Sequence, residues 1–164
     1  MEFFRWLEQT GFSIWIRESG SIWAYPLVLT MHTCGMGVLV GFNWAVDLRL
    51  LGFAPKIPVL SMERFFPVMW VGFWVNTATG IVLLIADAST KMTSWVFGVK
   101  MVFIVTAMIV LQKIRNNVFL KPSSNQAAVL ATGKHLAILS IAAWTLSITA
   151  GRLMAYLGPV SGLK

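Results

Sequence analysis

Apolar residues dominate four long stretches of the chain, and charged residues gather between them. The stretches cover residues 22–46, 65–86, 95–112 and 127–157, and the first two contain no charged side chain. About 20 helical residues cross the apolar core of a bilayer. The pattern therefore predicts an all-α fold: an integral membrane four-helix bundle that occupies residues 21–164.

Residues 1–20 show a different pattern, in which charged side chains such as Arg5 and Glu8 are interspersed with aromatic ones such as Trp6 and Trp15. This mixture is typical of an amphipathic helix that lies in the membrane interface with its apolar side toward lipid. A helix packed on the end of the bundle explains the pattern equally well. We expect one N-terminal interfacial amphipathic helix, separate from the four spans.

The composition agrees with a membrane protein, since 57% of the residues are hydrophobic and only 12% are charged, against about a quarter in soluble domains. The net charge of +7 does not indicate nucleic acid, because the basic residues lie between the apolar stretches and not along one polar face. Their distribution indicates topology instead.

Lysine and arginine are enriched in cytoplasmic loops of membrane proteins. The first and third connections contain six of them: Arg49, Lys56, Arg64, Lys113, Arg115 and Lys121. The opposite side contains four: Arg5, Arg17, Lys91 and Lys164. We therefore expect a multi-pass protein with both termini on the periplasmic side.

Two histidines lie inside the spans, where ionisable residues are costly and by default mark a functional site. His32, within "LTMHTCGMG", is about 15 Å into the first span at 1.5 Å per residue, and His135 is in the first third of the fourth span. Counted from the inner side, their heights are about 22 and 15 Å, a difference that helix tilt can close. The pair is predicted to meet at one cofactor, although each histidine has a hydrogen-bonded packing role as its alternative.

Two imidazoles on facing helices suit the two axial positions of a b-type haem. His32 and His135 are the predicted iron ligands, and Gly35, near His32, allows close backbone approach. Glycine also serves simply to let membrane helices pack. Lys134 and Lys100 are candidates to pair with the haem propionates, with anchoring at the membrane interface as the alternative.

Copper is a less favoured occupant of the same region. Thioether and thiolate ligands suit Cu(I), and Met36 shares a helix face with His32, whereas Cys34 lies about 160° around the helix. Cys34 is thus excluded as a partner of His32. The remaining pair, His32 with Met36, is weakened because methionine at helical spacing usually packs in a core.

The second span contains Asn76, Thr77 and Thr79. Such side chains usually form hydrogen bonds between membrane helices, and lining a quinone or cofactor pocket is the alternative. All six acidic residues lie outside the apolar centres of the spans, and no catalytic constellation is recognisable. This favours an electron-transfer or anchor subunit over a stand-alone enzyme, because in a redox carrier the cofactor supplies the chemistry.

Several segments resemble a family of small, uncharacterised bacterial four-helix membrane proteins. They are "YPLVLTMHTCGMGVLVGFNWAVDLRLLG" (25–52), "RFFPVMWVGFWVNTATGIVLLIAD" (64–87), "FGVK" (97–100) and "LSIAAWTLSITAGRLMAY" (139–156). The resemblance implies the fold and a bacterial inner membrane, but no activity. More loosely, a first-span histidine followed by small residues is similar to membrane haem proteins of the HemJ and CopD types, which implies that His32 is a haem ligand.

The expected function is that of a membrane-embedded b-type haem protein, a cytochrome b that passes electrons between a partner redox protein and the quinone pool. The alternative is a non-catalytic membrane anchor or structural subunit of a larger complex, in which the histidines only form hydrogen bonds. Lipid is the expected environment, a homo-oligomer is compatible with either function, and nucleic acid is not an expected partner.

Overall fold

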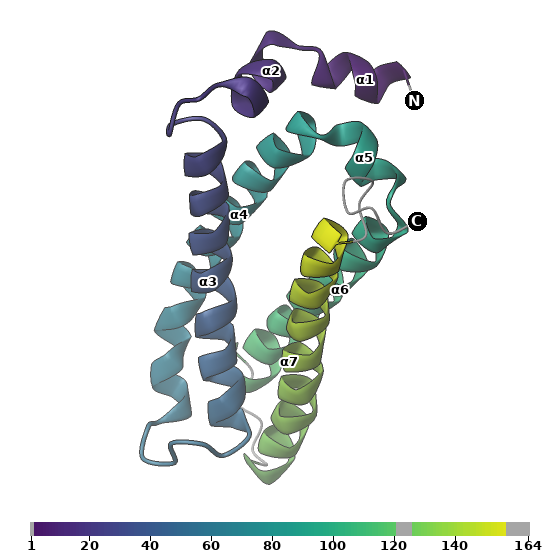
Figure 1. The fold of residues 1–164 in the computed structure, drawn as a ribbon. Coiled ribbons are helices and arrows are strands. Elements are labelled where there is room, and N and C mark those ends of the chain that lie inside the picture. Colours follow the sequence, from purple (N-terminus) through teal and green to yellow (C-terminus); the bar gives the residue numbers. More distant parts are fainter. Residues whose placement is uncertain (1, 121–125, 157–164) are drawn as a thin grey trace.

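The computed structural model describes residues 2–120 and 126–156, and these residues are all-helical (Figure 1). Four of its helices are long and apolar enough to cross a membrane, which confirms the predicted fold class. They are α3 (Tyr25–Leu50), α4 (Phe65–Ala86), α6 (Trp95–Ile114) and α7 (Gln126–Tyr156). The first of them ends at Leu50 and not near residue 46, so that it includes the polar "DLRL" segment.

Five short elements complete the described chain. They are α1 (Glu2–Glu8), α2 (Gly11–Glu18), the 3₁₀ helix η1 (Val59–Arg64), α5 (Ala88–Thr93) and the π-helix η2 (Arg115–Leu120). The element η1 leads directly into α4, and η2 continues α6 by six residues.

The N-terminal segment forms two helices where one was expected. Thr10 separates them, because its side chain accepts a hydrogen bond from the Ser13 N–H and caps α2. Both helices lie across one end of the bundle, where α1 contacts α4 and α5 and α2 contacts α4 (Figure 1). Their outer side is apolar and exposed, with Phe3, Trp6 and Trp15 on it. The segment thus packs on the end of the bundle and also has an exposed apolar side, and its position in the membrane interface stays a prediction.

The four long helices form two hairpins, α3 with α4 and α6 with α7, which make the most extensive contacts (Figure 1). In the first hairpin, Gly35 of α3 faces Gly72 of α4. A Cβ atom added at Gly35 would lie 2.9 Å from the Asn76 backbone nitrogen, and one added at Gly72 would lie 2.9 Å from the Gly35 carbonyl oxygen. These two glycines therefore allow the backbones of α3 and α4 to touch.

A buried polar network joins the two hairpins at one end, which we call the closed end. The Asn43 side-chain amide donates to Ser140 Oγ at 3.1 Å and to Asp47 Oδ2 at 2.8 Å, and Trp144 Nε1 donates to Asn43 Oδ1 at 2.8 Å. All four residues are buried, and hydrogen bonds offset the cost of burying such groups in an apolar interior. Among the described residues, Asp47 Oδ1 has no hydrogen-bond partner. The network thereby fixes α7 against α3.

Apolar side chains surround this network. The buried cluster contains residues of all four long helices, among them Leu39, Val46, Phe66, Ile114 and Ala137. Gly133 of α7 packs near the Leu50 side chain, which places the start of α7 beside the end of α3. The core of the protein therefore lies toward the closed end.

We predict that Gly35→Ala destabilises the protein by about 1–3 kcal/mol, because the added methyl group meets backbone atoms that have little room to move. Gly37→Ala is the matched control, since nothing lies within 4 Å of a Cβ added there. Thermal unfolding in detergent measures both variants. Equal melting temperatures would show that the α3–α4 contact is looser than described.

Candidate functional site

A cavity of about 1030 Å³ lies at the end of the bundle opposite the closed end, between the two hairpins and beneath α1 and α2. Its walls include Leu29 of α3, Leu83 of α4, Trp95 and Phe97 of α6, and Met154 of α7. Residues of every long helix therefore contribute to it. Its lining combines these apolar side chains with polar ones from α1, α2 and α5, and a concave site that joins apolar surface to polar groups is the usual form of a ligand or cofactor pocket.

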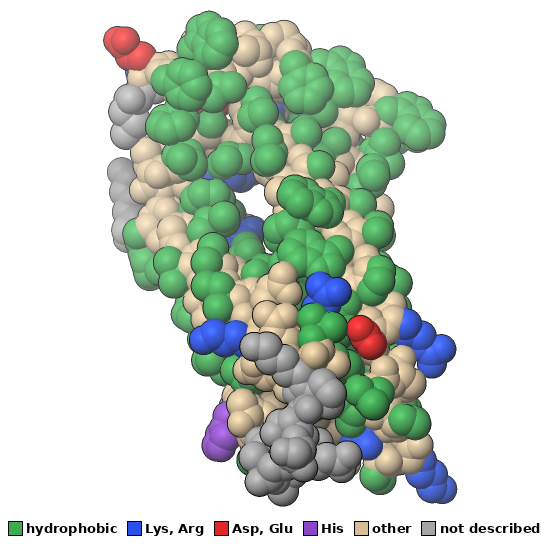
Figure 2. Space-filling view, turned by 180° about the vertical axis from the view of Figure 1, so that it is seen from behind, with side chains coloured by type: hydrophobic (Ala, Val, Ile, Leu, Met, Phe, Trp, Pro, Cys, Tyr) green, Lys and Arg blue, Asp and Glu red, His purple; other side chains and the backbone are tan. Residues whose placement is uncertain are grey.

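Positive charge is concentrated around this cavity. Its lining includes Arg5 of α1, Arg17 of α2, Lys91 of α5 and Lys100 of α6, and Asp87 is the one acidic residue among the described lining residues. Figure 2 shows Lys and Arg side chains within the opening in the upper half of the molecule. Asp87, Glu8 and Glu18 offset part of this charge, and an excess of cations in a partly apolar site attracts an anion.

His32 lies in the wall of the cavity and is held by α4. Its Nδ1 atom is 3.0 Å from the Asn76 carbonyl oxygen and 3.1 Å from Thr79 Oγ1, and the Asn76 side-chain amide donates to the His32 carbonyl oxygen at 2.7 Å. The expected hydrogen bonds between helices are therefore confirmed for Asn76 and Thr79.

These contacts assign the tautomer of the imidazole ring. A carbonyl oxygen only accepts hydrogen bonds, so Nδ1 carries the proton and Nε2 keeps its lone pair. Within residues 2–120 and 126–156, Nε2 has no hydrogen-bond partner. Gly80 provides the space for the ring, because a Cβ atom there would lie 3.1 Å from His32 Cε1.

The Lys100 side chain packs against α7 at Gly151, near the end of the helix that borders the cavity. A Cβ atom added at Gly151 would lie 3.7–3.8 Å from the Cδ, Cε and Nζ atoms of Lys100, so the lysine stem lies along this glycine. The helices α3 and α7 are antiparallel, and Asn43 of α3 is level with Ser140 of α7 because they are hydrogen-bonded. His32 lies eleven residues before Asn43, and Gly151 lies eleven residues after Ser140, so His32 and Gly151 are also level. His32 and Lys100 therefore line the same cavity, and the pairing of Lys100 with haem propionates stays a prediction.

The other predicted members of the site lie elsewhere. His135 and Lys134 are exposed on α7, and His135 is 16 residues from Gly151, or about 24 Å along the helix. The structure therefore does not bring His135 and Lys134 to His32, and the expected two-histidine geometry is not formed. The reason is the register between α3 and α7, which the Asn43–Ser140 contact sets.

Two residues close to His32 in sequence serve packing. Gly35 is buried in the contact with α4, and Met36 packs against the hydrophobic core and is not among the lining residues of the cavity. Cys34 is exposed, as its position around the helix predicts. No group of three or more His, Cys, Asp and Glu residues arranged to hold a metal ion occurs in the described part of the chain.

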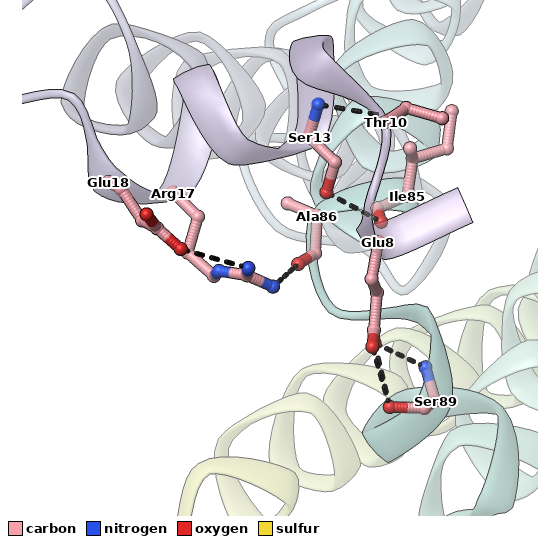
Figure 3. Close-up of polar contacts among 8 residues, drawn as sticks. All are labelled: Glu8, Thr10, Ser13, Arg17, Glu18, Ile85, Ala86 and Ser89. Carbon is pink, nitrogen blue, oxygen red and sulfur yellow. Dashed lines mark hydrogen bonds and ion pairs between the residues drawn. The ribbon is translucent and has the colours of Figure 1, made fainter. Parts of the chain in front are cut away.

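The corner between α4 and α5 forms one side of the cavity. Side chains of α2 form hydrogen bonds with the carbonyl groups of this corner (Figure 3). Ser13 Oγ donates to the Ile85 carbonyl oxygen at 3.3 Å, and Arg17 Nη1 donates to that of Ala86 at 3.4 Å. Lys91 Nζ donates to the Leu83 carbonyl oxygen at 2.6 Å. These bonds satisfy carbonyl groups that the last turn of a helix leaves without intrahelical partners. Burial lowers the pKa of Lys91, and nearby Asp87 opposes that shift.

The beginning of α5 is capped from α1. The Glu8 carboxylate accepts the Ser89 backbone N–H at 2.7 Å and the Ser89 hydroxyl at 2.8 Å (Figure 3). A carboxylate at a helix N-terminus is favourable because of the exposed N–H groups there. Partial burial raises the pKa of Glu8, but the Ser89 hydrogen bonds together with Arg17 and Arg5 outweigh it, and the net pKa is lowered.

Sequence reasoning missed three members of the cavity: Arg5, Arg17 and Lys91. These residues entered the prediction only as topology signals, because they belong to separate short elements whose meeting point is set by the fold. The aromatic and basic character of the N-terminal segment was the only available signal. It indicated a surface but not the cavity beneath it.

Comparisons with family models, curated proteins and solved structures found no match to this chain.

We predict that Glu8→Gln lowers stability at neutral pH by about 0.5–1 kcal/mol, because the partly exposed site loses a charged cap. The folded protein holds the Glu8 pKa below its ordinary value. The wild-type advantage is therefore complete above about pH 4.3 and disappears as the pH falls through the lower folded pKa.

Unfolding of the wild type and of Glu8→Gln between pH 3 and 7 measures this difference. Glu2→Gln serves as the control, since Glu2 is exposed and has no hydrogen bond among the described residues. A difference between the wild type and Glu8→Gln that persists at pH 3 would contradict the assigned role of the carboxylate.

Proposed function

We propose that this protein binds one b-type haem in the cavity, with His32 as its axial ligand, and passes electrons between a partner redox protein and the quinone pool. One observation carries the proposal: Nδ1 of His32 is held by the Asn76 carbonyl, which leaves Nε2 available at the cavity wall. A histidine that binds a metal commonly donates its other ring N–H to a carbonyl or carboxylate group.

The residues around the cavity fit a haem. Its volume, about 1030 Å³, lies at the upper end of the range for cofactor pockets, about 300–1,000 Å³. Gly80 makes room for the His32 ring and Gly151 for the Lys100 stem, so these glycines let both side chains lie against the walls. Lys100 and Lys91 supply positive charge for the propionates, whereas Lys134 is too far along α7 for this role.

The haem would supply one-electron exchange, and the chain would supply its position and environment. His32 is fixed by two hydrogen bonds to α4 and so has little freedom to rotate. The apolar walls limit access of water. In the orientation favoured by the lysine and arginine distribution, the cavity lies toward the periplasmic side of a bacterial inner membrane.

The proposal differs from the two-histidine arrangement in its coordination. His135 is about 24 Å away along the bundle, so His32 is the one imidazole that this chain offers to the cavity. An iron with a single strong protein ligand has an open or weakly bound sixth position, and such a centre binds carbon monoxide.

A structural subunit of a larger complex is the second candidate. The reciprocal bonds between His32 and Asn76 favour it, because they stabilise the α3–α4 contact whether or not Nε2 binds anything. The same residues then act only in helix packing. The two candidates differ in whether the purified protein contains haem.

Reduced-minus-oxidised absorption spectra of the purified protein test the proposal. We expect a haem b spectrum that responds to carbon monoxide, is lost in His32→Ala and is retained in the matched variant His135→Ala. A folded wild-type protein that neither contains nor takes up haem would refute the proposal and favour the structural subunit. Stoichiometric copper that disappears in Met36→Ala would refute it in favour of a copper site.

A further inference from the structure

We propose that α1 and α2 form a lid over the cavity, and that Arg5 and Arg17 on its inner side bind acidic groups of the ligand. The ligand class is then an amphiphile with an apolar body and at least two acidic groups. The inference deepens the proposed function, and it rests on that function only for identifying the ligand as haem, whose propionates are two such groups.

The charge of the cavity is the first argument. Two cations come from the bundle, Lys91 and Lys100, and two come from the lid, Arg5 and Arg17. Within the described ranges, the one ion pair that any of them forms joins Arg17 to the exposed Glu18 at 3.1 Å. Lys91 and Lys100 are partly buried, and Arg5 and Arg17 are exposed. Partly buried cations at the end of a membrane bundle are costly unless an anion compensates them. Four cations and Asp87 give the lining a net charge of +3, which a neutral quinone would leave unchanged and a dianion would reduce to +1.

The attachment of the lid is the second argument. Ile16 is buried and anchors α2, but the two hydrogen bonds that connect α2 to the end of α4 are 3.3 and 3.4 Å long, at the weak end of the range. Helices of seven and eight residues have little stability of their own. The shorter Glu8–Ser89 bonds, at 2.7 and 2.8 Å, hold α1 to α5. Opening the lid would break these contacts and those of α2, none of which joins one long helix to another.

The outer face of the lid is the third argument. Phe3 and Trp6 of α1 are 62% and 61% exposed, and Phe12 and Trp15 of α2 are also exposed. Figure 2 shows hydrophobic side chains gathered at this end of the molecule. A short helix with an aromatic face binds at the boundary between headgroups and acyl chains. An opened lid would thus remain in the interface, where a membrane-borne amphiphile is concentrated.

The test uses the full-length protein in detergent and two metal-free probes, protoporphyrin IX and its dimethyl ester. They share one macrocycle, and only the first carries free acids. Binding is measured by quenching of tryptophan fluorescence, since Trp95 lines the cavity. We expect the diacid to bind at least about tenfold more tightly than the ester, with an affinity that falls as salt is added.

The variant Arg5→Gln with Arg17→Gln removes both lid cations. We expect it to weaken binding of the diacid about tenfold and to leave binding of the ester unchanged. The matched control is Lys56→Gln with Lys113→Gln, which removes the same charge from exposed positions at the closed end. Equal affinity for the two probes, or equal effects of the two double variants, would overturn the acid-binding role.

The lid itself is tested by rates. Glu8→Gln weakens the α1–α5 contact by removing its charge, so both association and dissociation of the diacid should accelerate, dissociation the more because a less firmly docked lid also lowers affinity. Unchanged rates would overturn the lid.

The two proposals fail separately. The metal-free probes do not need His32 as a ligand, so arginine-dependent binding of the diacid without haem uptake would refute only the haem function. Haem uptake that requires His32 but not Arg5 and Arg17 would refute only the lid proposal.

Discussion

The hydrogen bonds from Asn43 to Ser140 and from Trp144 to Asn43 determine how the two hairpins meet. In a bilayer, apolar helices gain little from contact with one another compared with contact with lipid, so polar bonds and close backbone packing specify which helices associate. The bonds from Asn43 lie toward the closed end, and no other hydrogen bond joins α3 to α7 within the described residues. The opposite end is consequently free to hold a cavity between the hairpins.

The residues of the site also differ in how rigidly they are held. His32 lies on the tight α3–α4 hairpin, where Gly35 and Gly72 bring the backbones into contact and Asn76 fixes the ring. A ligand-binding group is most precise on rigid elements. The cations around the cavity come from elements that are short, as α1, α2 and α5 are, or from a flexible side chain, as for Lys100. His32 would fix the position of one part of a bound ligand, and the cations on short elements or flexible side chains would adjust to the other part.

The four spans could be predicted from the sequence because each depends on local composition alone. The bonding of Asn76 and Thr79 was also predictable, since polar side chains in a span need a partner. The pairing of His32 with His135 was not, because heights were counted from assumed loop ends, and α3 continues to Leu50. Register between helices that are distant in sequence depends on which side chains bond across the interface, and hydrophobic pattern does not contain that information.

The position of Arg17 shows why the N-terminal segment cannot be treated as a simple membrane anchor. Its guanidinium caps the Ala86 carbonyl, pairs with Glu18 and lines the cavity at the same time. A segment that only bound lipid would gain from turning its cations toward the headgroups, yet Arg5 and Arg17, although exposed, also line the cavity. The free energy of docking α1 and α2 is therefore coupled to the charge inside the cavity. If the proposed lid binds an anion, that anion would stabilise the docked helices, and by linkage the docked helices would increase affinity for it.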